Sequence, residues 1–125
     1  MSRKIMIIDD DKDFLEEICE LLTDAGYEVV TISDSLAVMS TAIQTKPDLI
    51  LLDLRMPAMC GFEVAVNLKN EAQTSKIPII AITGFAPIKD YSFVNSFCSI
   101  RKCLKKPLNP LDVIKEIEWT LNGKK

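Results

Sequence analysis

The stretch DLILLDL, residues 48–54, decides the fold, because it is apolar at every position between its first residue and Asp53. A strand that is apolar on both of its faces must be covered on both faces, which is the mark of a strand inside a parallel sheet. The run therefore predicts a central parallel strand. Asp53 is a lone carboxylate near the carboxyl end of this run.

Apolar runs and helical patterns alternate on both sides of this stretch. Short apolar or β-branched runs predict strands, and apolar residues that recur at steps of three and four predict helices. The predicted strands are KIMII (4–8), YEVVTI (27–32), DLILLDL (48–54), IPIIAIT (77–83) and IRKCL (100–104).

Five helices are predicted between and after these strands. The first has apolar positions from Phe14 to Ala25 and ends at Gly26, as helices commonly end at glycine. The last has Pro110 in its first turn, a position that suits proline. Its apolar stripe comprises Leu111, Val113, Ile114, Ile117 and Leu121. The other three helices are predicted after the N-cap residues 33–35 and up to Lys46-Pro47, at 62–72 after a turn at Gly61, and at 87–98.

Five strands alternating with five helices predict a doubly wound α/β fold, in which helices cover both faces of a five-stranded parallel sheet. Parallel strands need crossover connections, and these are right-handed almost without exception. The 125 residues suit a single domain, residues 1–125. In such sheets ligands bind beyond the carboxyl ends of the strands, so polar residues at those ends are the candidate site residues.

Composition disfavours several classes of function. The net charge of −3 argues against broad binding to nucleic acids or anionic membranes. No apolar run approaches the roughly 18–20 residues that cross a bilayer, and no signal peptide is evident, so a cytoplasmic protein is expected. The chain has no histidine, and its cysteines, Cys19, Cys60, Cys98 and Cys103, form no C-x-x-C pair. Zinc binding and imidazole catalysis are therefore disfavoured, and free thiols are expected.

Acidic, hydroxyl and basic residues stand at the carboxyl ends of the predicted strands. Asp9, Asp10 and Asp11 follow the first strand, and Asp53 ends the third. The fourth strand ends at Thr83-Gly84, and the fifth ends near Lys105-Lys106-Pro107. The fold class brings these ends to one edge of the sheet, although they are far apart in the chain.

The charges and ligand types indicate a chemistry. Asp9, Asp10 and Asp53 carry three negative charges, which one lysine and one divalent cation would balance. Oxygen ligands suit Mg²⁺ or Mn²⁺ rather than zinc or copper. A metal beside a lysine and a hydroxyl suits phosphoryl transfer, with Asp53 as the nucleophile. Asp11 is expected in solvent at the start of the first helix, where an acid favours the helix dipole.

Four motifs resemble the receiver domain of bacterial response regulators: MIIDDD (6–11), LILLDLRMPAMCGFE (49–63), AITG (81–84) and CLKKPL (103–108). The resemblance covers essentially the whole chain and implies a flavodoxin-like three-layer sandwich. It implies that Asp53 accepts a phosphoryl group, and that Thr83 and Lys106 contact this group. It also implies that Asp10, Asp53 and the backbone carbonyl of Arg55 bind Mg²⁺, or Mn²⁺ in its place, with Asp9 acting through water.

The resemblance also implies partners. The phosphoryl donor would be a histidine kinase or a histidine phosphotransfer protein, and the output would pass to a downstream effector or a fused output domain. Such a domain catalyses its own phosphorylation and dephosphorylation and is not a conventional turnover enzyme. Direct nucleic-acid or membrane binding is not expected of it.

Some residues depart from the family pattern and leave an alternative open. Cys103 stands where the family usually has an aromatic residue that moves on activation, so the output face looks altered. A pseudo-receiver that binds partners without phosphorylation is therefore the alternative. A haloacid-dehalogenase-type phosphatase is disfavoured because Arg55 stands where it needs a second acid. A dinucleotide-binding module is disfavoured because three aspartates would repel phosphate.

Overall fold

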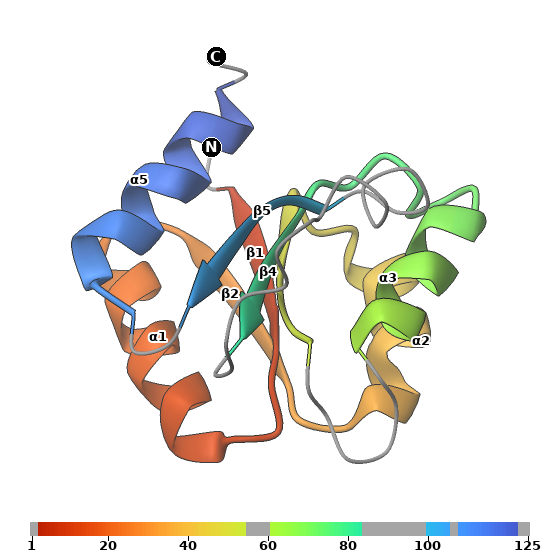
Figure 1. Cartoon of the computed structure of the whole chain (residues 1–125), viewed down its shortest axis with the longest axis horizontal. Helices are drawn as coiled ribbons and strands as arrows, with labels where there is room; N and C mark the ends of the chain where they lie inside the picture. The colour runs from red at the N-terminus through yellow and green to blue at the C-terminus, as the bar shows by residue number, and fades with distance from the viewer. Residues whose placement is uncertain (1–2, 55–60, 84–99, 106–107, 123–125) are drawn as a thin grey trace.

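The structure, a computed structural model, describes residues 3–54, 61–83, 100–105 and 108–122 (Figure 1). In this part of the chain one sheet contains five strands in the order β2-β1-β3-β4-β5. Every neighbouring pair is parallel, as predicted. The strands are β1 (Lys4–Ile8), β2 (Glu28–Ile32), β3 (Leu49–Asp53), β4 (Ile79–Thr83) and β5 (Ile100–Lys105).

Helices cover both faces of the sheet, so the doubly wound architecture is confirmed. In Figure 1, α1 (Lys12–Asp24) and α5 (Pro110–Leu121) lie on one face, and α2 (Val38–Thr45) and α3 (Gly61–Asn70) lie on the other. A short 3₁₀ helix, η1 (Ser35–Ala37), precedes α2. The helix predicted at 87–98 lies outside the described residues. No helix in the described ranges is long and apolar enough to span a membrane.

The sheet separates two apolar cores, and the strand alternation explains which residue enters which core. Successive side chains of a strand point to opposite faces. Met6, Ile50 and Leu52 accordingly pack with α2 and α3. Leu49 and Leu51 pack with α1 and α5 on the other face. All five residues of β3 are buried, which confirms the prediction made from the continuous apolar run.

Two positions predicted to face the core do not, and each has a local reason. Ala25 is exposed because α1 ends at Asp24, one residue earlier. Gly26 then adopts a φ of 98°, which turns the chain away from the helix. Leu111 is 71% exposed. It lies two residues before the buried Val113, and at about 100° per residue it points away from the buried face of α5. The apolar character of Leu111 misled the prediction, because side-chain direction and not residue type decides burial.

The N-cap prediction for α2 was partly wrong. Asp34 does act as a cap, since its Oδ1 accepts a hydrogen bond from the N–H of Leu36 at 3.0 Å. It caps the 3₁₀ helix η1, however, and α2 has no side-chain cap of its own. The predicted end of α2 is confirmed: Lys46 adopts a left-handed φ of 50°, and Pro47 follows it.

Candidate functional site

The strand pairing brings Asp9 and Asp53 together at the carboxyl edge of the sheet. Ile8 of β1 pairs with Leu52 of β3, so the two aspartates follow at equivalent positions of neighbouring strands. A backbone hydrogen bond continues the pairing of β1 with β2 past the end of β1. The N–H of Asp9 donates to the carbonyl of Ile32 at 3.0 Å. Both aspartates are therefore placed by the sheet and not by a free loop.

One carboxylate oxygen from each of Asp9, Asp10 and Asp53 lies within 4.8 Å of the others. Asp9 is fully buried, Asp53 is 5% exposed, and Asp10 is exposed. The cluster is thus closed toward the core and open at Asp10. The carboxylates of Asp9 and Asp10, from the turn after β1, and of Asp53, from the end of β3, converge at the end of the sheet where α1 begins.

The donor set of this cluster suits a hard divalent cation. Like charges at such separations repel one another, and burial removes part of the water that would screen them. The oxygens are hard ligands, which Mg²⁺ and Mn²⁺ prefer, and Mg²⁺ commonly takes one or two carboxylates and keeps several waters. The residues present therefore fit such an ion, with Asp10 as the exposed member of the set.

Asp11 is exposed, as expected, but it also has a structural role that the sequence analysis missed. It is the N-cap of α1, and its Oδ1 accepts hydrogen bonds from the N–H groups of Asp13 and Phe14. Its own N–H donates to Oδ1 of Asp9 at 2.9 Å. The signal was available, since aspartate is a preferred N-cap residue. Placing the start of the helix at the first apolar residue, Phe14, concealed it.

The remaining predicted site residues are only partly described. Thr83 is the last residue of β4, next to β3 at the same edge of the sheet as Asp53. Its backbone pairs with Lys105 of β5, which is exposed. Arg55 and Lys106 lie outside the described residues.

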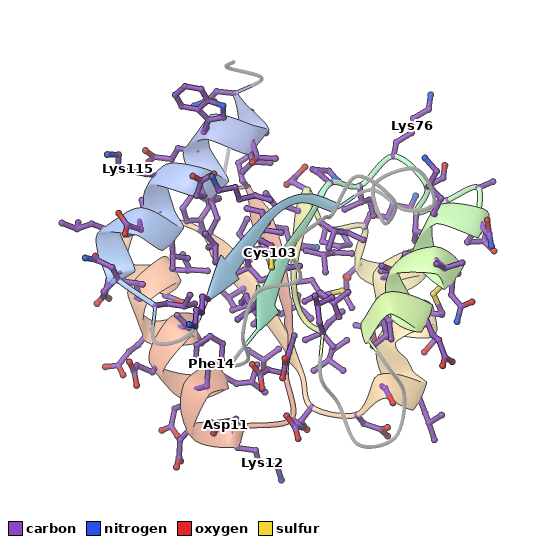
Figure 2. All side chains as sticks on the ribbon, in the orientation of Figure 1. Asp11, Lys12, Phe14, Lys76, Cys103 and Lys115 are labelled. Carbon is purple, nitrogen blue, oxygen red and sulfur yellow. The ribbon has the colours of Figure 1, made fainter. Side chains whose placement is uncertain are left out.

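Cys103 lies on β5 beside Ala81 and packs, partly buried, against the core on the α2 and α3 side (Figure 2). It and Cys19 are free thiols, as predicted, whereas Cys60 and Cys98 lie outside the described residues. Trp119 of α5 is half exposed. A thiol therefore occupies a partly buried place in the layer between β5 and the helices.

The chain belongs to the response regulator receiver domain family, whose model matches residues 5–118. The polar-differentiation response regulator DivK of Brucella anthropi is 34% identical over 86 residues, which cover 69% of this chain and 70% of DivK. A DNA-binding transcriptional regulator of Synechocystis is 37% identical over 87 residues, but the match spans 36% of its length. The chain thus corresponds to about a third of that longer relative.

Solved structures share the fold. The chemotaxis protein CheY4 of Vibrio cholerae has a TM-score of 0.86 and 27% sequence identity, covering 94% of this chain and 98% of CheY4. The receiver domain of the sensor histidine kinase PA1611 of Pseudomonas aeruginosa has a TM-score of 0.85 at 20% identity and covers 98% and 99% of the two chains. The structure of PA1611 has a magnesium ion coordinated in its active site cleft.

Proposed function

We propose that this receiver domain is a phosphorylation-controlled switch in which Asp53 accepts a phosphoryl group in the presence of Mg²⁺. The cluster of Asp9, Asp10 and Asp53 carries the proposal, because a carboxylate oxygen of Asp53 lies within 4.8 Å of carboxylate oxygens of Asp9 and Asp10. Membership of the receiver family supports the same chemistry. Carboxylates form aspartyl-phosphates in several classes of protein.

The proposed cation ligands come from three segments. Asp10, Asp53 and the backbone carbonyl of Arg55 would hold Mg²⁺, or Mn²⁺ in its place, and Asp9 would act through a water molecule. When bound, the cation neutralises charge on the phosphoryl oxygens and on the carboxylates around them. Asp9 and Asp53 are buried, which would restrict the directions of their carboxylates around a bound cation.

In the proposed transfer, a carboxylate oxygen of Asp53 forms a bond to the phosphorus of a phosphohistidine on the donor. The bond from phosphorus to the histidine nitrogen breaks, and its electron pair stays on the imidazole ring. Thr83 would donate a hydrogen bond to the new phosphoryl group, and Lys106 would pair with its charge. Phosphorylation adds charge and acceptor oxygens at the sheet edge, which biases the surrounding loops toward a second arrangement.

The proposed partners follow from the same role. The donor would be a histidine kinase or a histidine phosphotransfer protein, and the recipient of the signal a downstream effector or a fused output domain. Residues 1–125 would act as one receiver unit in the cytoplasm, with no direct contact to nucleic acid or membrane. The unit would catalyse only its own phosphorylation and dephosphorylation, and so would not be a conventional turnover enzyme.

A pseudo-receiver that binds partners without phosphorylation is the second candidate. The position of Cys103 favours it, because a small thiol occupies the partly buried place on β5 where the family usually has an aromatic residue. The two candidates differ in whether Asp53 reacts.

Reaction with acetyl phosphate separates the two candidates. With Mg²⁺ present, the wild-type chain should gain one phosphoryl group by mass spectrometry, and the Asp53→Ala variant should gain none. Asp48→Asn is the matched control, because Asp48 precedes the other end of β3 and accepts a hydrogen bond from the N–H of Lys4. This variant should react as the wild type does. No adduct on the wild type, or an equal adduct on Asp53→Ala, would exclude the proposed function.

A further inference from the structure

The turn from β1 to α1 carries two of the three clustered aspartates and is anchored at both of its ends. At its start, the N–H of Asp9 donates to the carbonyl of Ile32 in β2. At its end, the N–H of Asp11 donates to Oδ1 of Asp9 at 2.9 Å. Asp10 therefore lies between two anchored residues, so the direction of its carboxylate depends on both anchors.

Asp11 joins this turn to the first turn of α1. Its Oδ1 accepts hydrogen bonds from the N–H groups of Asp13 at 3.1 Å and Phe14 at 3.2 Å. Its carbonyl accepts from the N–H of Leu15 at 3.0 Å, which begins the helix. Figure 2 shows Asp11 at the N-terminal end of α1. An N-cap satisfies N–H groups that have no partner inside the helix, so the side chain of Asp11 holds the first turn closed.

We infer that Asp11 is a positioning residue for the cation site, a role that rests on the proposed function. By capping α1, Asp11 keeps its own N–H fixed against Asp9, and thereby keeps the carboxylates of Asp9 and Asp10 beside Asp53. Without the cap the first turn of α1 opens in a fraction of the molecules. Those molecules lack the assembled cluster, and the apparent affinity for a cation falls with the fraction that is competent to bind.

A simpler effect of Asp11 has to be separated from capping. Its carboxylate is an anion close to the cluster, so its removal weakens cation binding through charge alone. Asp11→Asn removes the charge but keeps a side-chain oxygen that caps helices well. Asp11→Ala removes both. The difference between these two variants therefore measures the cap. Asn109→Ala is the control for cap loss elsewhere, since Asn109 caps α5 through the N–H of Leu111 at 2.9 Å.

The test is calorimetric titration of the metal-free full chain with Mg²⁺ alone. The dissociation constant of Asp11→Ala should exceed that of Asp11→Asn by up to about fivefold, the limit reached when the open form predominates without the cap. Asn109→Ala should bind Mg²⁺ as the wild type does. A second measurement needs no variant: because coupling is reciprocal, Mg²⁺ should slow hydrogen exchange at the amides of Asp13 and Phe14.

The outcomes distinguish the two proposals. If the wild type binds Mg²⁺ but the two Asp11 variants have equal dissociation constants, the positioning role is overturned and the proposed function stands. The positioning role is also overturned if Mg²⁺ does not change the rate of hydrogen exchange at the amides of Asp13 and Phe14. This second result is decisive even if Asp11→Ala does not fold. If the wild type binds no Mg²⁺ at millimolar concentration, the proposed function is overturned, and the positioning role with it.

Discussion

At the scale of single residues, like charges lie close together at the carboxyl edge of the sheet. Asp9 and Asp53 are buried and lie within 4.8 Å of each other through their carboxylate oxygens. Coulomb's law with an effective dielectric constant of about 20 gives a repulsion of roughly 3 kcal/mol for such a pair. A bound cation would relieve this repulsion between the two carboxylates. Close, buried like charges depart from the rules of packing, as is typical of functional sites.

Replacing Asp53 with asparagine should therefore stabilise the metal-free protein. Asp53→Asn removes one charge with little change in volume, so the free energy of unfolding in EDTA should rise by about 1–3 kcal/mol. Millimolar Mg²⁺ should raise the melting temperature of the wild type by mass action, and should raise that of the variant much less. Urea and thermal unfolding with EDTA or Mg²⁺ measure both effects.

Glu20→Gln is the matched control for that prediction, because Glu20 is an exposed acid on α1. It should leave the response to Mg²⁺ unchanged. A less stable Asp53→Asn variant that keeps the full Mg²⁺ response would show that the three aspartates are not a cation site.

At the scale of elements, the helices end where other hydrogen bonds replace the helical ones. At the end of α1, the N–H groups of Gly26 and Tyr27 donate to the carbonyls of Thr23 and Leu22, which is the Schellman arrangement. After α3, the hydroxyl of Thr74 donates to the carbonyl of Leu68 at 2.5 Å. The carbonyl of Leu68 thus has a partner outside the helix, and α3 ends at Asn70, two residues before the predicted end.

Thr74→Val tests how much the bond to Leu68 stabilises the connection between α3 and β4. Thr74 is 1% exposed, so valine of similar shape leaves the carbonyl of Leu68 without this donor in a buried place. The free energy of unfolding should fall by about 1–2 kcal/mol in urea titrations. Ser40→Ala removes an exposed hydroxyl from α2 and should change it by less than about 0.5 kcal/mol. Equal effects of the two substitutions would contradict the role given to Thr74.

At the scale of the whole molecule, the sheet contributes side chains to both apolar cores. The side chains of β3 alternate between the core under α1 and α5 and the core under α2 and α3. A substitution that destabilises one core should therefore also destabilise the other, because the same strands contribute side chains to both. The described residues are thus expected to unfold in a single cooperative transition.

This coupling can be tested by placing a substitution and a probe on opposite sides of the sheet. The substitution is Leu52→Ala, and the probe is the fluorescence of Trp119, the only tryptophan. Leu52 is fully buried on the α2 and α3 side, whereas Trp119 lies on α5 across the sheet. The substitution should lower the free energy of unfolding by about 2–5 kcal/mol. The urea midpoints from Trp119 fluorescence and from far-ultraviolet circular dichroism should shift together. A Trp119 midpoint that stays at the wild-type value would mean that the two layers unfold separately.

The sequence by itself determined the parallel sheet, the strand positions and the family. The apolar run 49–52 required cover on both faces, and the periodicity of the remaining segments supplied the helices that cover it. These features are local, because a strand or helix pattern needs only neighbouring residues. The acids at the strand ends were recognisable as site candidates for the same reason.

Only the tertiary structure showed through which contacts these residues come together. Asp9 and Asp53 come together because β1 and β3 pair in one particular register, which no local pattern specifies. Leu111 turned out exposed because the buried face of α5 is set by the direction in which that helix packs. Asp11 changed from a solvated acid to the cap that ties α1 to the aspartate cluster. Residue type and spacing determine an element, whereas contacts between elements depend on the packing of the whole sheet.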